Sequence, residues 1–532
     1  MRSLLEAGPQ TSRYAMYRDV RPICVPGWQL DTVHSPARTF GSCGIQFEPN
    51  GRLWITELVG NQISSWDPRT DRLRIESGLD SPIHTPDDVA FDSAGTAYIT
   101  TMHDGNVMGI CPGGEVFTVA EERPENNGVT VGPSGRIFVD QMRPGGQLVE
   151  IYRDPARKPR VILPELDWAN ALEQGPDGRV YLQHFFEGYV LAVDPDSGEA
   201  ERVAEGFDLI SAVRFDPRGR LVVLESGSGA VTAVDLSTGE RSRLATSVQG
   251  LDNCAFDAAG CLYVSHYTSG RIVRFEAGVD RVDKVISEGG LVGPYGMAYR
   301  DSASIVCADF MSVVRVGLDG SSEALSHLAN HPYIVGIARL GESSYAGLAE
   351  GGEVFDLDLS RIVSGPLSAD LPAASALGPA GPRTAVLGTL TGEALTIGSG
   401  GRVLATVRTG LAKVGAVAAE QDTLVAADPD AGQVMIRAAG QVRTVTGPWR
   451  PAAVGVHEGQ VYVVDEIGRS VERISPGGAR EVVVSGLPIG FPVEGKRTTA
   501  RRPSLLSVPG HGLLVGCDGD GSIRRLRGSS RR

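Results

Sequence analysis

A segment of roughly 40 residues that recurs along the chain is the feature that most constrains its fold. One copy starts at Cys43 and reads CGIQFEPNGRLWITELVGNQISSWDPRTDRLRIESG, and the next starts at Pro86 and reads PDDVAFDSAGTAYITTMHDGNVMGICPGGEVFTVA. Four more begin NNGVTVGPSGRIFVDQ, ANALEQGPDGRVYLQH, ISAVRFDPRGRLVVLE and DNCAFDAAGCLYVSH. Weaker copies start near Gly296, Gly336, Ser375, Gly415, Ala453 and Ser504. Units of this length bury their apolar faces against neighbouring copies.

Each copy carries the same succession of short strands and turns. An apolar strand ends in a turn with glycine, as at Asn50-Gly51 and Asp177-Gly178, and a second strand such as RLWITE follows. Glycine suits these turns because it adopts positive φ without steric cost, and the chain has 68 Gly. Two further strands complete the unit. Four-stranded units repeated radially predict an all-β protein built from β-propeller blades.

The number of copies predicts more than one ring. About twelve blades exceed the four to eight of a typical propeller. We therefore expect two tandem six-bladed propellers, with seven plus five blades as the alternative. The expected division is an N-terminal segment over 1–39, a first propeller over 40–290 and a second, degenerate propeller over 291–532. The last copy lacks an outer strand, which the segment WQLDTVH (Trp28–His34) is suited to supply, closing one of the rings.

Composition excludes several classes of function. Lys and Arg total 50 and Asp and Glu total 64, so the net charge of −14 disfavours nucleic acids and anionic membranes as partners. The seven cysteines include no CxxC pair, which favours reduced thiols. Neither a secretory signal nor an apolar run of membrane-spanning length is found. We expect a cytoplasmic protein that binds a small-molecule substrate, and the oligomeric state stays open.

Polar residues recur at two positions of the first six copies. One position lies at the start of the inner strand and the other at the end of the second strand, and we expect both on the face that holds the mouth of the first ring. The first set is Ser42, Asp87, Asn127, Asn170, Ser211 and Asp252. The second set is Glu57, Thr101, Gln141, His184, Glu225 and His266.

Carboxylate and amide oxygens around a narrow axis suit a hard divalent cation, Ca²⁺ or Mg²⁺. The expected metal ligands are Asp87, Asn127, Asn170 and Asp252. Histidine and glutamate nearby are suited to proton transfer. The expected catalytic residues are His184, His266, Glu225 and Glu57. Each also has a structural interpretation, because Asp and Asn cap turns and a lone histidine is often a packed, hydrogen-bonded residue.

The second half of the chain does not repeat this pattern. Its corresponding positions near Val335, Val414 and Ala452 are apolar. We therefore assign the site to the first ring, and a supporting or interface role to the second.

The stretch RPENNGVTVGPSGRIFVDQM, with WANALEQGPDGRVYL after it, resembles the gluconolactonase/regucalcin-like (senescence-marker) family. This resemblance implies a six-bladed propeller that opens lactones with a divalent metal. Asn127 and Asn170 match the asparagines that help to hold that metal. The family has Glu and Asp at two further positions, where this sequence has Ser42 and Ser211, so Asp87 and Asp252 would have to substitute.

A second resemblance is to virginiamycin B lyase and NHL-type propellers. It rests on GIQFEPNGRLWITELVGNQI, with Thr56, Glu57 and Asn61 in place. It implies a Mg²⁺-dependent eliminase that uses histidine and glutamate on one propeller face. Together, the two resemblances cover roughly residues 40 to 290.

The leading hypothesis is a metal-dependent enzyme of secondary metabolism that hydrolyses a lactone or ester, or that acts as a lyase by β-elimination. The alternative is a non-catalytic propeller that serves as a binding or assembly module, because fold does not imply function.

Overall fold

The computed structural model describes residues 16–17, 20–121, 123–154, 156–327, 331–359, 363–490 and 502–528. Almost all regular structure in this part of the chain is strand, apart from the short 3₁₀ helix η1 (Ser399–Gly401). The strands form twelve antiparallel sheets of four strands, one of which gains a fifth short strand. The predicted all-β fold of about twelve four-stranded blades is therefore confirmed. No described helix is long and apolar enough to cross a membrane.

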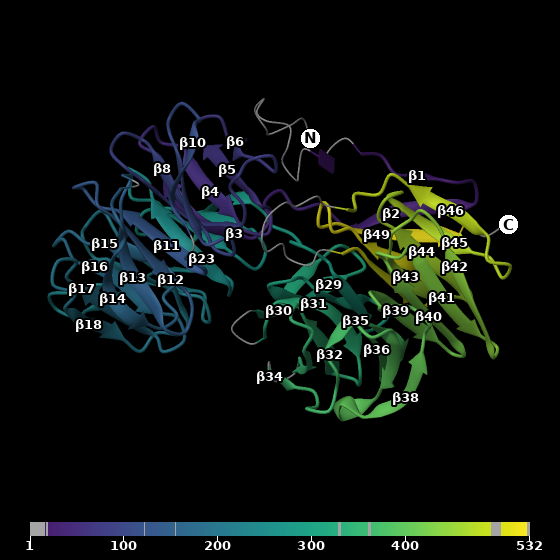
Figure 1. The fold of residues 1–532 in the computed structure, drawn as a ribbon. Coiled ribbons are helices and arrows are strands. Elements are labelled where there is room, and N and C mark those ends of the chain that lie inside the picture. Colours follow the sequence, from purple (N-terminus) through teal and green to yellow (C-terminus); the bar gives the residue numbers. More distant parts are fainter. Residues whose placement is uncertain are drawn as a thin grey trace. The chain divides into compact units, whose positions relative to one another are not determined.

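The described chain divides into two compact units. The first contains Arg38–Gly289. Its six sheets, labelled in part in Figure 1, are β3 (Ser42–Phe47), β4 (Leu53–Glu57), β5 (Gln62–Asp67) and β6 (Arg72–Ser77); β7 (Pro86–Phe91), β8 (Ala97–Thr101), β9 (Asn106–Ile110) and β10 (Val116–Ala120); β11 (Asn126–Val131), β12 (Ile137–Gln141), β13 (Gly146–Ile151) and β14 (Arg160–Leu166); β15 (Leu172–Gln174), β16 (Val180–His184), β17 (Tyr189–Val193) and β18 (Ala200–Glu205); β19 (Ile210–Phe215), β20 (Leu221–Glu225), β21 (Ala230–Val234) and β22 (Arg241–Thr246); β23 (Leu251–Phe256), β24 (Leu262–His266), β25 (Ile272–Phe275) and β26 (Val282–Ser287).

The second unit contains Tyr17–Ala37 and the described residues after 289. Its six sheets are β27 (Gly296–Tyr299), β28 (Ser304–Ala308), β29 (Ser312–Gly317) and β30 (Ser322–His327); β31 (Ile334–Arg339), β32 (Ser344–Ala349), β33 (Val354–Asp358) and β34 (Val363–Pro366); β35 (Ala374–Gly381), β36 (Thr384–Thr389), β37 (Glu393–Ile397) and β38 (Val403–Arg408); β39 (Ala416–Glu420), β40 (Thr423–Asp428), β41 (Gln433–Ala438) and β42 (Gln441–Thr446); β43 (Pro451–His457), β44 (Gln460–Asp465), β45 (Ser470–Ile474), β46 (Arg480–Ser485) and β1 (Ile23–Cys24); β47 (Ser504–Val508), β48 (Gly512–Gly516), β49 (Ile523–Gly528) and β2 (Trp28–His34).

The inner strands of each unit contact one another in a closed cycle. In the first unit the order is β3, β7, β11, β15, β19 and β23, and β23 returns to contact β3. In the second unit the order is β27, β31, β35, β39, β43 and β47, and β47 contacts β27. A closed cycle of radial sheets is the propeller arrangement, which places the first residues of all six inner strands around one axis.

Apolar side chains that pack between neighbouring sheets hold each ring together. β20 reads LVVLE, a nearly continuous apolar run, because a blade is covered by a neighbour on both faces. Between the last and the first sheets of the first unit, Ile45, Ile55 and Trp66 pack with Tyr263. Tyr263 also meets Phe47 edge to face, with ring centroids 5.0 Å apart. A blade therefore buries its faces only when both neighbours are in place.

The N-terminal segment completes the last sheet of the second unit. β2 pairs antiparallel with β49, with Leu30 opposite Leu526. Trp28 and Leu30 pack against the apolar cluster that contains Val515 and Leu526. Trp28–His34 thus supplies the missing outer strand, and the ring that it closes is the second.

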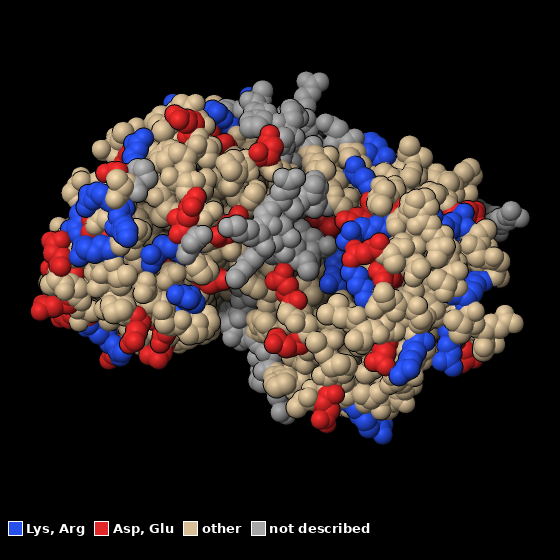
Figure 2. Space-filling view, viewed as in Figure 1, with Lys and Arg blue, Asp and Glu red and all other residues tan. Residues whose placement is uncertain are grey.

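Three basic residues near the C-terminus, Arg524, Arg525 and Arg527, lie in β49 and form ion pairs. Arg525 and Arg527 pair with Asp31 of β2, and Arg524 pairs with Asp520. On the face shown in Figure 2, basic side chains lie among acidic ones over the surface.

Candidate active site at the mouth of the first ring

Six residues at one register line the start of the inner strands of the first unit. In five of the six sheets the inner strand contains a bulge after its first paired residue, so that Ser42 lies opposite Glu57 just as Pro86 lies opposite Thr101. The residue equivalent to Asp87 is therefore Cys43. The assignment of Ser42 to this position was one residue too early. The corrected set is Cys43, Asp87, Asn127, Asn170, Ser211 and Asp252.

Two of these residues are carboxylates that repel each other. Burial and the charge of Asp252 raise the pKa of Asp87 well above its ordinary value. Burial and the charge of Asp88 raise the pKa of Asp252 to about 8. Burial and the same two carboxylates, Asp252 and Asp87, raise the pKa of the Cys43 thiol. Without a counter-charge, this part of the mouth therefore holds protons at neutral pH.

The two asparagines use their amide nitrogens and leave their amide oxygens unused. Asn170 Nδ2 donates to Ser211 O at 2.6 Å, and Asn127 Nδ2 lies 3.6 Å from Met142 Sδ. Oδ1 of each makes no hydrogen bond with the described part of the chain. Both side chains are mostly buried, with 4% of Asn127 and 8% of Asn170 exposed. Each therefore keeps an oxygen available for a cation or a substrate donor.

A buried ion pair lies next to this set of residues. Arg214 Nη2 is 3.5 Å from Asp88 Oδ1, which also accepts a hydrogen bond from Asn253 Nδ2 at 3.1 Å. Arg214 Nη1 donates to Leu172 O at 3.1 Å and so links inner strands of different sheets. Burial raises the pKa of Asp88, and the Arg214 guanidinium opposes that rise. The sequence analysis missed both residues because their pairing joins strands far apart in the chain.

In four of the six sheets, the side chain one residue before the end of the second strand connects neighbouring blades, and none of these residues stands out in the sequence. Thr56 Oγ1 donates to Asp87 O of the next blade, and Ser265 Oγ donates to Cys43 O at 2.6 Å. Gln183 Nε2 makes the equivalent bond to Ser211 O at 3.1 Å. These bonds hold the carbonyl groups of the mouth residues and thereby fix the position of the backbone from which their side chains extend.

Two glutamates, Glu57 and Glu225, are expected to be catalytic. Each accepts a hydrogen bond from a backbone N–H that lies just before the inner strand of its own sheet. Glu57 is fully buried, and its Oε2 accepts hydrogen bonds from Phe40 N and Gln62 Nε2, both at 2.9 Å. Glu225 Oε2 accepts from Asp208 N at 3.2 Å, and its Oε1 accepts from Thr232 Oγ1 at 3.0 Å. Both carboxylates thus stabilise turns, and their catalytic roles stay predictions.

The two histidines expected to be catalytic differ in how many of their imidazole nitrogens make hydrogen bonds. His266 is fully buried, with Nε2 2.9 Å from Ser247 Oγ and Nδ1 3.1 Å from Arg271 O. Burial lowers its pKa to about 4, so the ring is neutral at physiological pH. His184 Nδ1 accepts from Glu187 N at 3.1 Å, whereas its Nε2 lies 4.0 Å from Glu187 Oε1. The catalytic roles of both histidines also stay predictions.

Among the described residues, no group of three His, Cys, Asp or Glu side chains is arranged to hold a metal ion. A cation at the mouth would therefore depend on two carboxylates together with amide oxygens. Asp87, Asp252, Asn127 and Asn170 form such a mixed oxygen set, which is the kind of donor set that Ca²⁺ and Mg²⁺ accept.

Comparison with known proteins points to the same part of the chain. Residues 40–289 match the family model described as the SMP-30/Gluconolactonase/LRE-like region. The match covers just under half of the chain and coincides with the first unit. The resemblance of this unit to the gluconolactonase-like propellers is thus confirmed. The comparison with curated proteins finds no match.

Solved structures provide a further comparison. The streptogramin B lyase structure is 13% identical over 60% of this chain and 94% of its own, with a TM-score of 0.36. Virginiamycin B lyase from Staphylococcus aureus is 16% identical over 56% of this chain and 98% of its own, with a TM-score of 0.38. The tricorn protease is 13% identical over 92% of this chain and 58% of its own, also with a TM-score of 0.38.

Proposed function

We propose that the first unit is a small-molecule enzyme that uses a divalent cation at its mouth to hydrolyse a lactone or ester, or to catalyse an elimination. One observation carries the proposal. Two carboxylates and two amide oxygens share one register around the axis of the ring that matches the gluconolactonase-like family model.

The electrostatics of the mouth support a cation as the missing partner. Burial and the charge of Asp252 raise the pKa of Asp87, and burial and the charge of Asp88 raise the pKa of Asp252, because nearby buried carboxylates do not all ionise readily. A divalent cation would remove that repulsion and release the protons. Asp87, Asp252, Asn127 and Asn170 would hold it, and Ca²⁺ or Mg²⁺ bound there would polarise a carbonyl or ester oxygen of the substrate.

Of the predicted proton carriers, His184 is favoured by the geometry. Its Nδ1 is fixed by Glu187 N, which orients the ring, and the described chain offers Nε2 only a 4.0 Å contact. His266 has hydrogen-bond partners on both ring nitrogens. In this proposal His184 Nε2 accepts a proton from water or substrate, and His266 keeps its own blade in place.

Calorimetric titration of Ca²⁺ and of Mg²⁺ into metal-free protein tests the cation. We expect binding near one ion per chain, with proton release that depends on the ionisation enthalpy of the buffer. Asp87→Asn with Asp252→Asn should abolish it, whereas Glu240→Gln, an exposed carboxylate on a turn, should leave it unchanged. Absence of near-stoichiometric binding would contradict the metal site.

A panel of lactones, esters and cyclic depsipeptides, followed by proton release or by mass spectrometry, tests the reaction. We expect turnover that is lost with Asp87→Asn and reduced by about 10² to 10⁴-fold with His184→Ala. Stoichiometric metal binding without turnover of any substrate would favour the alternative of a binding or assembly module. Unchanged turnover in His184→Ala would show that this residue carries no proton.

A further inference from the structure

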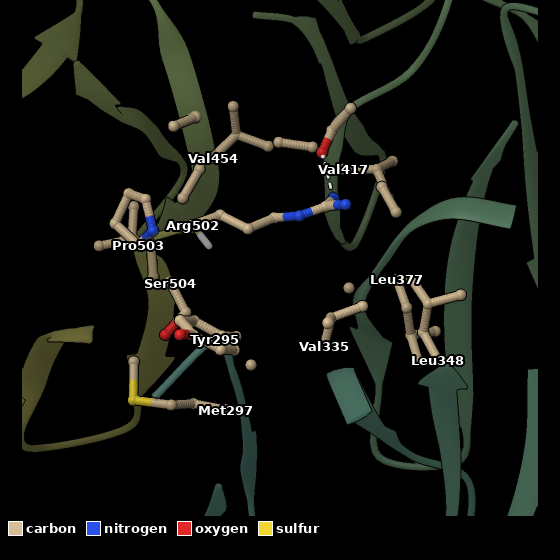
Figure 3. Close-up of a pocket in the computed structure, with 18 of the residues that line it drawn as sticks. Tyr295, Met297, Val335, Leu348, Leu377, Val417, Val454, Arg502, Pro503 and Ser504 are labelled. Carbon is tan, nitrogen blue, oxygen red and sulfur yellow. Dashed lines mark hydrogen bonds between the residues drawn. The ribbon is translucent and has the colours of Figure 1, made fainter. Parts of the chain in front are cut away.

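A cavity lies on the axis of the second unit, outside the site described above. Residues from all six inner strands of that unit line it, and its volume is about 60 Å³. Most of the residues that line it have apolar side chains, among them the labelled Val335, Leu348, Leu377, Val417, Val454 and Met297 in Figure 3. A space of this size holds a few small atoms rather than a drug-sized ligand.

Among the described lining residues, Arg502 alone carries a charge. It lies two residues before β47 and extends across the cavity toward Val417 (Figure 3). Nη1 donates to Ser375 O at 2.6 Å and to Gly415 O at 3.1 Å. These two carbonyls fix the position of the guanidinium group without neutralising it.

The rest of the guanidinium has no protein acceptor in the described chain. Nε and Nη2 of Arg502 make no hydrogen bond there, and no described carboxylate lies within ion-pair distance of the group. Burial lowers the pKa of Arg502, and the negative charge of Glu350 opposes this. Because an arginine remains protonated at any physiological pH, the cavity holds a positive charge that lacks an adjacent counter-ion.

We propose that this cavity binds a small monocarboxylate of about two to four carbon atoms, with its carboxylate on Arg502 and its alkyl group against the apolar wall. The planar guanidinium presents its free N–H groups as a fork that matches a carboxylate. The apolar wall favours an alkyl tail over a spherical or fully hydrated anion. The site is independent of the function proposed for the first unit.

The second ring therefore differs from the purely apolar one that Val335, Val414 and Ala452 suggested. Arg502 stands just before the sixth inner strand, where no repeated polar position marks it in the sequence. Its role depends on Ser375 and Gly415 of two other sheets, which the ring brings together.

Calorimetric titration of propionate into the full chain at low ionic strength tests the proposal. The protein is first stripped of divalent ions, so that the first unit cannot contribute a cation-bound carboxylate. We expect one propionate per chain, and at least about 10-fold weaker binding of propionamide, which has a similar shape without the charge. Arg502→Gln should weaken propionate binding at least about 10-fold, and Arg437→Gln, an exposed arginine of the same unit, should not change it.

Arg502→Lys provides a second variant in case the glutamine variant does not fold, because it keeps the charge and loses the fork. It should bind propionate more weakly than the native chain. Equal binding of propionate and propionamide, unchanged binding in Arg502→Gln or in Arg502→Lys, or no propionate binding at all would each overturn the proposal. Inorganic phosphate or chloride binding as tightly as propionate would overturn the assignment to a carboxylate.

Discussion

Asp140 accepts a hydrogen bond from the backbone N–H of Gly128 at 2.8 Å through Oδ1, and its Oδ2 has no partner in the described chain. At the equivalent position of two other blades, Thr56 and Ser265 donate a hydroxyl proton to a carbonyl of the next blade. Asp140 thus places a carboxyl group, with one oxygen unpartnered in the described chain, where those two blades have a hydroxyl. Burial accordingly raises the pKa of Asp140 to about 7.

This pKa makes the stability of the first unit depend on pH. The folded chain keeps a proton on Asp140 that the unfolded chain loses above about pH 4, so the free energy of unfolding should fall as pH rises from 4 to 7. Asp140→Asn removes this dependence and should exceed the native chain in stability at pH 8 by up to about 4 kcal/mol. Denaturant unfolding at pH 5 and pH 8 measures the difference, with Glu240→Gln as control. A difference independent of pH would contradict the assignment.

His266 should give the opposite dependence on pH. Its pKa of about 4 in the folded state lies below the ordinary value of 6.5, so the unfolded chain takes up a proton first on acidification. The contribution of His266 to the free energy of unfolding should fall by about 3 kcal/mol between pH 6.5 and pH 4, opposite in direction to the contribution of Asp140. In His266→Gln this contribution should be absent, which urea titrations at several pH values can measure. A native chain and variant with parallel pH profiles would show that the buried ring does not titrate in this way.

Removing one partner of the buried pair of Arg214 and Asp88 should destabilise the first unit more than removing both. Arg214→Gln leaves the Asp88 carboxylate buried without its cation and should destabilise the first unit by about 3 to 5 kcal/mol at pH 7. The double variant Arg214→Gln with Asp88→Asn should recover part of that loss, because no unpaired charge then remains buried. Equal loss in the single and double variants, measured by thermal unfolding, would mean that the charges are not coupled.

Closure of the second ring by the N-terminal strand predicts an effect on that unit alone. Leu30→Asp places a charge against the apolar cluster that contains Val515 and should destabilise the second unit by about 2 kcal/mol or more. Gln29→Asp, on the exposed face of the same strand, is the matched control. Hydrogen exchange followed by mass spectrometry resolves the two units. Increased exchange in β3 to β26 without change in β47 to β49 would contradict this role of β2.

The sequence by itself determined the repeat, the four-stranded unit and the position of the polar residues Asp87, Asn127, Asn170 and Asp252 at the start of inner strands. These follow from local patterns, because apolar runs and glycine turns lie within one copy of the repeat. The bulge that makes Cys43 the equivalent of Asp87 is visible only in the pairing of the strands, where it occurs in five of the six sheets of the first unit.

Only the tertiary structure decided which ring Trp28–His34 closes, because β2 and β49 lie almost the whole chain apart in the sequence. It also decided that Arg214 meets Asp88, and that Arg502 reaches the carbonyls of Ser375 and Gly415. Such contacts depend on ring closure, which brings all six inner strands to one axis. A pattern within a single repeat contains no information about which side chains meet there.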